Sequence, residues 1–368
     1  MDYRISCAKC GRRQPETAFR CASCGSILEV SYRGRGKLLR QDRGKPISRY
    51  LDFLPIGNLY VELGEGGTPL KRISSGEFKD IGLFLKLETG NPTMTFKDRG
   101  SAVEISKAVE LKMRAVCCAS TGNMGLSVAH YARQAGMRCT IFISKDANAK
   151  KIEKIRRQGA RIVEVKGDFN KALNEAEAFA RKTGAFLCGD YHFRKEGQKT
   201  LGFEVVEQSG KEMPDYVFMP VGNATLFSGV YKGLTEFKKA GLVEQIPRLV
   251  AVQSEKCDPL VSAWLKKKKL SYVRPRTEAD AIAVGYPTFG FEGIEAIRKS
   301  KGDAVAVAEK EIEDAVMGLE RFGVYAELGG GTGFAGFLKY YRENPAKLKG
   351  KRVVVVVTGN NEGVFREQ

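Results

Sequence analysis

Short apolar runs alternate with segments of helical periodicity over much of the chain. This order of strand and helix predicts parallel sheets whose strands are joined by crossover helices, so the fold class is α/β. The valine run at 353–357 is apolar at every position, as expected of a strand buried on both faces. The predicted strands are 27–32, 115–120, 139–143, 161–165, 185–188, 216–221, 248–253 and 353–357, and the predicted helices are 125–135, 150–158 and 171–182.

Four cysteines form two pairs near the N-terminus, and a glycine follows each pair. Cys7 pairs with Cys10, and Cys21 pairs with Cys24. This spacing is typical of zinc knuckles, in which four thiolates surround the metal tetrahedrally. A site with four protein ligands has no open position, so we expect a structural zinc in a small ribbon over 1–35. The alternative is two unrelated pairs of reduced thiols.

Composition and charge set wide limits on function. The chain has 368 residues, 43% of them hydrophobic, which fits two or three globular domains. We find neither an apolar run of membrane-spanning length nor an apolar signal region, so we expect a cytoplasmic protein without a membrane partner. Lys and Arg number 61 against 43 acidic residues, a net charge of +18. Nucleic acid or an anionic substrate could account for that excess, and charge alone does not decide between them.

One lysine occupies a position suited to covalent chemistry. The segment 90–100, GNPTMTFKDRG, places Lys97 among turn formers and small polar residues just before an amphipathic run. A lysine at such a loop-to-helix junction can lose its proton and form a Schiff base with an aldehyde. The alternative is a solvated surface lysine after a turn.

Three further loops follow predicted strands, where open α/β sheets place their binding sites. The segment 220–229, PVGNATLFSG, has small residues that let backbone N–H groups approach an anion at a helix N-terminus. The segments 120–125, STGNMG, and 357–361, VTGNN, also end strands. Each loop by itself could be an ordinary turn or a helix cap.

Together these motifs resemble those of pyridoxal-phosphate (PLP) enzymes of the tryptophan-synthase-β fold type, fold type II, and among them most closely the threonine synthases. Segments 63–70 (LGEGGTPL), 84–88 (FLKLE) and 194–200 (RKEGQKT) match further motifs of that family, and the resemblance covers nearly the whole chain. A four-cysteine N-terminal module also occurs in that family.

The resemblance implies a domain arrangement around the parallel sheets. It predicts a large PLP-binding domain of 36–95 and 195–368, and a smaller α/β domain of 96–194, with the active site in the cleft between them. The zinc ribbon precedes both domains.

The resemblance also implies a role for each motif. Lys97 would hold PLP and serve as the general base. Asn123 would hydrogen-bond the oxygen of the PLP ring, and Thr358 would face its pyridine nitrogen. The substrate would be bound by Ser120, Thr121 and Arg194, and the phosphate of PLP by Gly222, Asn223, Ala224, Thr225 and Leu226.

The implied activity is the conversion of O-phospho-L-homoserine and water to L-threonine and phosphate by a homodimer that binds a small anionic amino acid. Segments 188–193 (CGDYHF) and 327–333 (ELGGGTG) depart from the family's substrate-facing pattern. Two alternatives therefore remain. One is another fold-type-II PLP enzyme, such as a threonine/serine dehydratase or an O-phosphoserine-dependent synthase. The other is a paralogue that binds PLP and has a regulatory function. The basic charge and the ribbon favour a nucleic-acid-binding protein, but the motifs do not, so we do not expect nucleic acid as a partner.

Two minor signals have simpler interpretations. The segment 331–336, GTGFAG, matches the dinucleotide-binding pattern, and we predict a strand before it and a helix from it. No second strand with an acidic tip is evident after it, so we do not expect a dinucleotide. His130 lies in a predicted helix and is expected to be structural, whereas His192 could meet the substrate because it is near Arg194.

Overall fold

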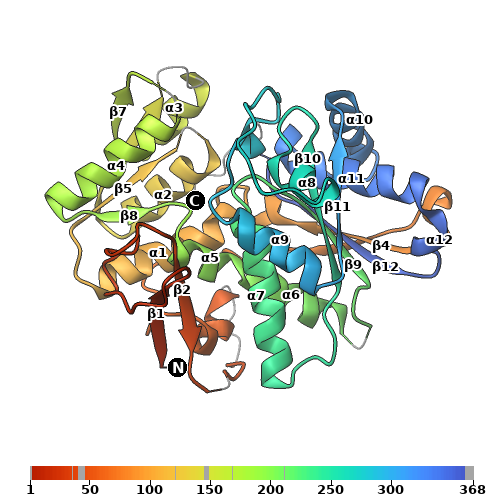
Figure 1. Ribbon diagram of the computed structural model, residues 1–368, viewed down its shortest axis with the longest axis horizontal. Helices are drawn as coiled ribbons and strands as arrows, with labels where there is room; N and C mark the ends of the chain where they lie inside the picture. Colours follow the sequence, from red (N-terminus) through yellow and green to blue (C-terminus); the bar gives the residue numbers. More distant parts are fainter. Residues whose placement is uncertain are drawn as a thin grey trace. The chain divides into compact units, whose positions relative to one another are not determined.

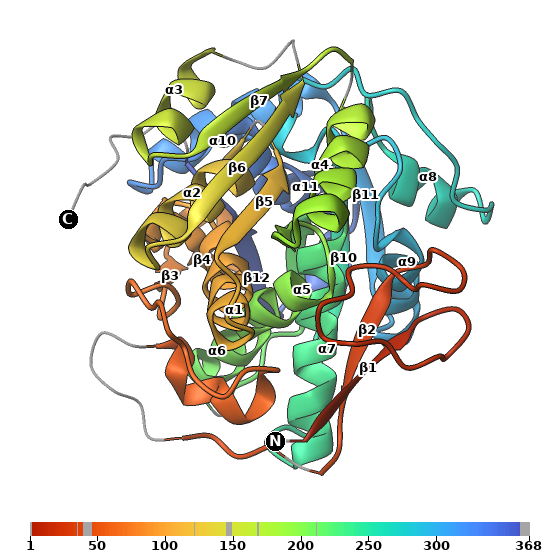
Figure 2. The same ribbon diagram turned by 90° about the vertical axis from the view of Figure 1, so that its left-hand side faces the viewer.

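The chain forms two compact units, each built around a wholly or mostly parallel sheet (Figures 1 and 2). The computed structural model describes residues 2–34, 36–39, 46–120, 122–144, 149–167, 169–210 and 212–360. Unit 1 comprises Met1–Glu65 and Lys97–Gln198, and unit 2 comprises Gly66–Phe96 and Lys199–Gln368. The predicted α/β class is confirmed, while the domain boundaries drawn from the sequence stay predictions.

Unit 1 contains a four-stranded parallel sheet in the order β7-β6-β5-β8 and a separate antiparallel pair, β1 and β2. Its elements are β1 (Tyr3–Cys7), β2 (Leu28–Tyr32), a 3-10 helix (Ile47–Phe53), α1 (Lys97–Glu110), β5 (Ala115–Ala119), α2 (Asn123–Gln134), β6 (Arg138–Ser144), α3 (Ala149–Arg157), β7 (Arg161–Val165), α4 (Phe169–Thr183), β8 (Phe186–Cys188) and α5 (His192–Gln198).

Alanine spacing explains how α4 packs on this sheet. Ala172, Ala176 and Ala180 recur every four residues, so they form one flat stripe along the helix. The three alanines belong to a buried cluster that also contains Cys117 and Ala119 of β5. The predicted strands and helices from 115 to 188 are confirmed within a few residues, because their apolar periodicity matches the faces that the sheet buries.

Unit 2 contains a six-stranded sheet in the order β11-β10-β9-β12-β4-β3, in which only β3 is antiparallel to its neighbour. Its elements are β3 (Leu70–Ile73), 3-10 helices (Gly76–Phe78, Glu88–Gly90, Asp280–Ile282), β4 (Gly82–Leu87), α6 (Thr200–Ser209), β9 (Tyr216–Pro220), α7 (Thr225–Ala240), β10 (Arg248–Ser254), α8 (Pro259–Leu265), α9 (Gly290–Lys299), β11 (Asp303–Val307), α10 (Glu309–Glu320), α11 (Leu328–Glu343), α12 (Pro345–Leu348) and β12 (Arg352–Val357).

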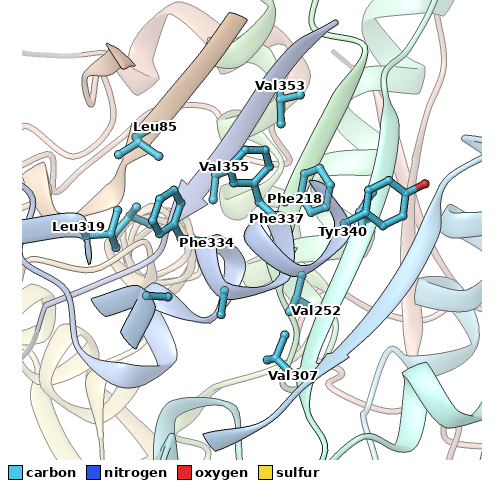
Figure 3. Close-up of a cluster of buried hydrophobic side chains, with 14 of the residues drawn as sticks. Leu85, Phe218, Val252, Val307, Leu319, Phe334, Phe337, Tyr340, Val353 and Val355 are labelled. Carbon is cyan, nitrogen blue, oxygen red and sulfur yellow. The ribbon is translucent and has the colours of Figure 1, made fainter. Parts of the chain in front are cut away.

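The core of unit 2 lies between its sheet and α11. Figure 3 shows Phe334 and Phe337 of α11 beside Val355 of β12, with Phe218 of β9 and Tyr340 in the same cluster. The predicted burial of the valine strand is confirmed, since Val353 through Val357 are at most 1% exposed. Since consecutive side chains point to opposite faces of the sheet, β12 is buried on both faces.

The glycine pattern at 331–336 serves packing. All three glycines lie within α11, which begins at Leu328. A Cβ at Gly331 would lie 2.5 Å from Val316 Cγ2, and a Cβ at Gly336 would lie 2.4 Å from Val252 Cγ2. The helix therefore needs glycine to approach α10 and β10 closely. The predicted preceding strand is wrong, because residues 322–327, all described, form none.

Across the described residues, no helix combines the length and the apolar character that crossing a membrane would require.

Candidate active site

Lys97 is the first residue of α1 and is half-buried. Phe96, the residue before it in the chain, donates its N–H to the Thr358 carbonyl oxygen at 3.0 Å. Thr95 forms an isolated bridge with Gly359, and the Asn360 N–H donates to the Met94 carbonyl at 3.0 Å. Unit 2 thus ties the loop before the lysine to the loop after β12, two segments that the sequence separates widely.

The lysine loop carries a strained residue. Met94 has a φ of 61°, in the left-handed region that non-glycine residues rarely adopt. The Met94 N–H donates to the Asn91 carbonyl at 2.8 Å, and Asn91 Nδ2 in turn donates to the Glu88 carbonyl at 2.8 Å. Strain of this kind persists only where surrounding contacts impose it, and it concentrates at functional loops.

A buried polar network supports this loop and was missed in the sequence. Lys86 Nζ donates to Glu204 Oε2 at 2.7 Å and to the Thr68 carbonyl at 2.6 Å. Thr68 Oγ1 donates to Glu88 Oε1 at 2.6 Å. The network connects the segments 63–70 and 84–88. The sequence does hold a signal for this network, because Lys86 lies within an otherwise apolar strand. A lysine buried there needs a polar partner.

The predicted phosphate loop lies between β9 and α7 in unit 2. Ala224, the N-cap of α7, has a φ of 58° and makes no side-chain cap. A Cβ at Gly222 would lie 3.3 Å from Ile282 Cα, so glycine keeps this turn closely packed. The side-chain Oδ1 of Asn223 accepts hydrogen bonds from the N–H and hydroxyl of Thr288, both at 3.1 Å. An uncapped N-terminus of a sixteen-residue helix suits an anion such as the phosphate of PLP.

The loop after β5 in unit 1 carries Ser120 and Asn123, both buried. Gly122 donates its N–H to Ser120 Oγ at 3.3 Å, and a Cβ at Gly125 would lie 2.7 Å from the Ser120 carbonyl oxygen. The loop therefore turns tightly into α2, as the motif predicts. The predicted substrate ligand Thr121 lies outside the described residues.

Arg194 of α5 is fully buried beside the backbone of Lys97. It donates to the Lys97 carbonyl at 3.1 Å and to Ser101 Oγ at 3.2 Å, and it forms an ion pair with Glu104. Burial lowers the pKa of Arg194, but the Glu104 carboxylate, together with smaller contributions from Cys118, Asp190 and Cys188, outweighs that effect and raises the pKa. Within unit 1, Arg194 therefore contacts the main chain of Lys97. The sequence did not reveal this positioning role of Arg194. Its predicted contact with substrate stays a prediction, as does that of His192.

Glu65 is another buried acid that the sequence did not single out as a functional group. Its Oε2 accepts hydrogen bonds from the Tyr131 hydroxyl at 2.6 Å and from the Leu63 N–H at 2.8 Å. Burial raises the pKa of Glu65 from 4.5 to about 7, although these hydrogen bonds oppose the shift. His130, on the same helix as Tyr131, bonds Gln158 at 3.0 Å, as its expected structural role implies.

The four N-terminal cysteines converge in unit 1. All four Sγ atoms lie within 4.8 Å of one another. The Sγ separations are 3.5 Å for Cys7–Cys24, 3.7 Å for Cys10–Cys21 and 3.8 Å for Cys10–Cys24. A tetrahedron with Zn–S bonds of about 2.3 Å has edges of about 3.8 Å, so the donor set fits a zinc ion. We call residues 2–34 the cysteine module.

Outer contacts in the cysteine module orient the sulfur atoms. Gly11 and Gly25 have φ values of 70° and 68°, which permit the turn after each cysteine pair as predicted. The N–H groups of Lys9 and Cys10 donate to Cys7 Sγ at 3.3 and 3.4 Å. Burial raises the pKa of Cys7, but these donors and the neighbouring thiols outweigh it and lower the pKa to about 6. Gln14 Nε2 lies 3.6 Å from Cys21 Sγ. Such donors favour the thiolate form that a metal requires.

Comparison with known proteins identifies the family of this chain. The family model described as "Pyridoxal-phosphate dependent enzyme" matches residues 61–359. The threonine synthase of Methanocaldococcus jannaschii is 35% identical over 374 residues, covering 96% of this chain and 91% of that one. The threonine synthase of Mycobacterium tuberculosis (strain H37Rv) is 36% identical over 322 residues, covering 85% and 87%.

Solved structures share the fold. Maize serine racemase superimposes with a TM-score of 0.69 at 23% identity, covering 80% of this chain and 88% of that one. Threonine deaminase isoform 2 from Solanum lycopersicum, in its processed form, gives a TM-score of 0.69 at 22% identity, covering 89% and 94%. The predicted fold type II is confirmed. Since the family model covers most of the chain and the curated relatives match it over nearly its whole length, the chain belongs to the pyridoxal-phosphate-dependent enzymes and, within them, to the threonine synthase family.

Proposed function

We propose that this chain converts O-phospho-L-homoserine and water to L-threonine and phosphate. The family supports this reaction, and one contact supports the site most directly. The 3.0 Å hydrogen bond from Phe96 to the Thr358 carbonyl joins the lysine loop to the loop proposed to face the PLP ring. A main-chain hydrogen bond therefore joins two segments that we propose bind the cofactor.

We propose that PLP is held by Lys97, Asn123, the 222–226 loop and Thr358. Bound PLP supplies an electron sink that stabilises negative charge on the substrate carbons. The N-terminus of α7 would bind the phosphate of PLP through backbone N–H groups. The hydroxyl of Thr358 would hydrogen-bond the pyridine nitrogen as an uncharged partner, and the amide of Asn123 would bond the ring oxygen.

The remaining proposed residues act on the substrate. The amine of Lys97 would act as general base and remove protons from Cα and Cβ. Protons would return to Cγ, from which phosphate leaves, and to Cα, while water adds at Cβ. Ser120 and Thr121 would bind the substrate carboxylate, and Arg194 would stabilise the departing phosphate. Within the described residues, the buried Nε of Arg194 has no hydrogen-bond partner, which leaves that donor for a ligand.

A substrate comparison tests the reaction. The PLP-loaded protein is incubated separately with O-phospho-L-homoserine, O-phospho-L-serine and L-threonine, and phosphate, threonine and 2-oxo acids are measured. We expect equal amounts of threonine and phosphate from O-phospho-L-homoserine alone. Formation of a 2-oxo acid from L-threonine without threonine synthesis would overturn the proposal in favour of a dehydratase.

We also propose that Cys7, Cys10, Cys21 and Cys24 bind one structural zinc ion. The sulfur separations support four-thiolate tetrahedral coordination, which leaves no position for a substrate. The homodimer and the cytoplasmic location expected from the sequence stay predictions.

A further inference from the structure

The cysteine module packs on the helices that carry Lys97 and Arg194. Its two strands, β1 and β2, appear as a red hairpin in Figure 2. The cysteines lie at one end of this hairpin, because β1 ends at Cys7 and β2 begins four residues after Cys24. The opposite end carries Tyr3 and Tyr32, which are register partners. Contacts with the rest of unit 1 come from that opposite end, from Glu29 and from the loop between the cysteine pairs.

Helix α5 receives two polar contacts from β2. The Tyr32 hydroxyl donates to Glu196 Oε2 at 2.6 Å. Lys195 Nζ forms an ion pair with Glu29, and the Lys195 side chain is only 5% exposed. A cation this buried requires a compensating partner, and Glu29 supplies one.

Helix α1 receives a third contact from β1. Lys107, whose side chain is 0% exposed, donates to the Tyr3 hydroxyl at 2.7 Å and to Glu110 Oε1 at 2.9 Å. The same ammonium lies 5.2 Å from the centre of the Tyr3 ring and 5.6 Å from that of Phe193 in α5. The module and both helices therefore share one buried cation.

A fourth contact reaches α4 from the loop between the cysteine pairs. Arg20 Nε donates to Glu177 Oε1 at 2.7 Å, and the Tyr191 hydroxyl donates to the same oxygen at 3.0 Å. The Phe19 ring packs edge-on against Tyr191, with centroids 5.8 Å apart. Tyr191 directly precedes α5, so this contact also fixes the start of that helix.

Helix α5 in turn fixes the backbone at Lys97. Arg194 donates to the Lys97 carbonyl at 3.1 Å. The two helices touch at their main chains, because a Cβ at Gly197 would lie 2.1 Å from the Arg99 carbonyl oxygen. A Cβ at Gly100 would lie 2.6 Å from Arg194 Cγ. Such close contact leaves α5 little freedom to move without displacing the first turn of α1.

The hairpin needs an additional source of stability. Two strands alone are marginal in water, and a four-thiolate metal site contributes its binding free energy to folding. We propose that the cysteine module is a metal-dependent positioning element for the proposed catalytic Lys97. With metal bound, the hairpin holds α5 through Glu29–Lys195 and Tyr32–Glu196, and α5 holds the Lys97 carbonyl through Arg194. Lys195 and Glu196 are positioning residues in this account, which rests on the proposed function of Lys97.

Hydrogen–deuterium exchange of the PLP-loaded, full-length protein tests this proposal. The Cys10→Ser/Cys24→Ser variant removes the metal, whereas Glu29→Gln/Tyr32→Phe keeps the cysteines and removes the contacts with α5. In both variants we expect amide exchange in residues 97–104 and 192–198 to rise about tenfold or more, because each lost charge-assisted hydrogen bond is worth about one decade. Zinc content, measured in parallel, should fall only in the cysteine variant.

The control is Arg33→Gln, because the Arg33–Asp2 ion pair lies in the same module but is 76% and 69% exposed. It should leave exchange in both segments unchanged. Wild-type exchange in 97–104 and 192–198 of the zinc-retaining Glu29→Gln/Tyr32→Phe variant would overturn the proposal, even if the cysteine variant failed to fold. Exchange is measured without substrate, so absence of threonine formation by the wild-type protein would count against the proposed function alone.

Discussion

At the scale of single residues, the pair of Arg194 and Glu104 combines two charges inside unit 1, with side chains 0% and 1% exposed. The desolvation cost of such a pair is offset only while both partners are present. Arg194 also bonds the Lys97 carbonyl, so this pair sets both the stability of unit 1 and the position of the lysine.

We expect Arg194→Met to lower the free energy of unfolding by about 3–5 kcal/mol, because it leaves the Glu104 carboxylate buried without its partner. Arg194→Met/Glu104→Gln should recover part of this loss, since it removes the stranded charge. Urea unfolding of the wild type and both variants measures the effect. Equal stability of the single variant and the wild type would contradict a buried ion pair.

Glu65 gives a pH dependence with a defined sign. Its pKa rises from 4.5 to about 7 on folding, chiefly through burial. Between these values the folded chain binds the proton and the unfolded chain does not, so stability falls as pH increases and levels off above about pH 7. The slope from this group is at most about 1.4 kcal/mol per pH unit.

Glu65→Gln should therefore flatten the stability profile between about pH 5 and pH 7. Urea unfolding at several pH values measures the profile. Glu175→Gln, at an exposed position of α4, is the control and should keep the wild-type slope. A profile of Glu65→Gln that parallels the wild type would show that Glu65 does not hold the proton.

At the scale of elements, α11 positions the loop that follows β12. A Cβ at Gly330 would lie 2.2 Å from the Gly359 carbonyl oxygen, which is backbone and cannot rotate away. Gly318 of α10 is a helical glycine with room, because its nearest neighbours would be 3.8 and 4.0 Å from a Cβ. The two sites form a matched pair for the same substitution.

We expect Gly330→Ala to lower the free energy of unfolding by about 1–3 kcal/mol through overpacking. It should also weaken PLP retention, because the segment carrying Thr358 and Gly359 must shift. Gly318→Ala should stabilise the chain by about 0.5–1 kcal/mol through helix propensity. Thermal unfolding and PLP titration followed by absorbance check both. Destabilisation of equal size by the two substitutions would contradict the packing argument.

Helices and strands could be predicted from the sequence where a local apolar pattern determines both their type and their burial. The strands from 115 to 188 and the valine strand β12 have apolar positions that burial in a parallel sheet demands. The glycines at 331–336 could not be assigned locally, because a dinucleotide loop and a tightly packed helix both require glycine. The neighbours Val316, Pro220 and Val252 distinguish the two, and no local pattern in the sequence places them beside these glycines.

At the scale of the whole molecule, the motifs predicted the cofactor family but not the supporting contacts. Lys97, the loop at 222–226 and Thr358 were recognisable because each lies in a short segment with its own pattern. The partners Lys86–Glu204 and Arg194–Glu104 are 118 and 90 residues apart, so no local pattern joins them. A buried charge signals that a partner exists, while the fold alone determines which residue it is.

The most direct test of the account is the attachment site of PLP. The PLP-loaded protein should absorb visible light, and borohydride reduction followed by peptide mass spectrometry should place the cofactor on the peptide that contains Lys97. Lys97→Ala should lose the visible band while keeping the wild-type unfolding profile. Label on the peptide of another lysine, such as the buried Lys86, or a Lys97→Ala protein that retains the band, would contradict the proposed active site.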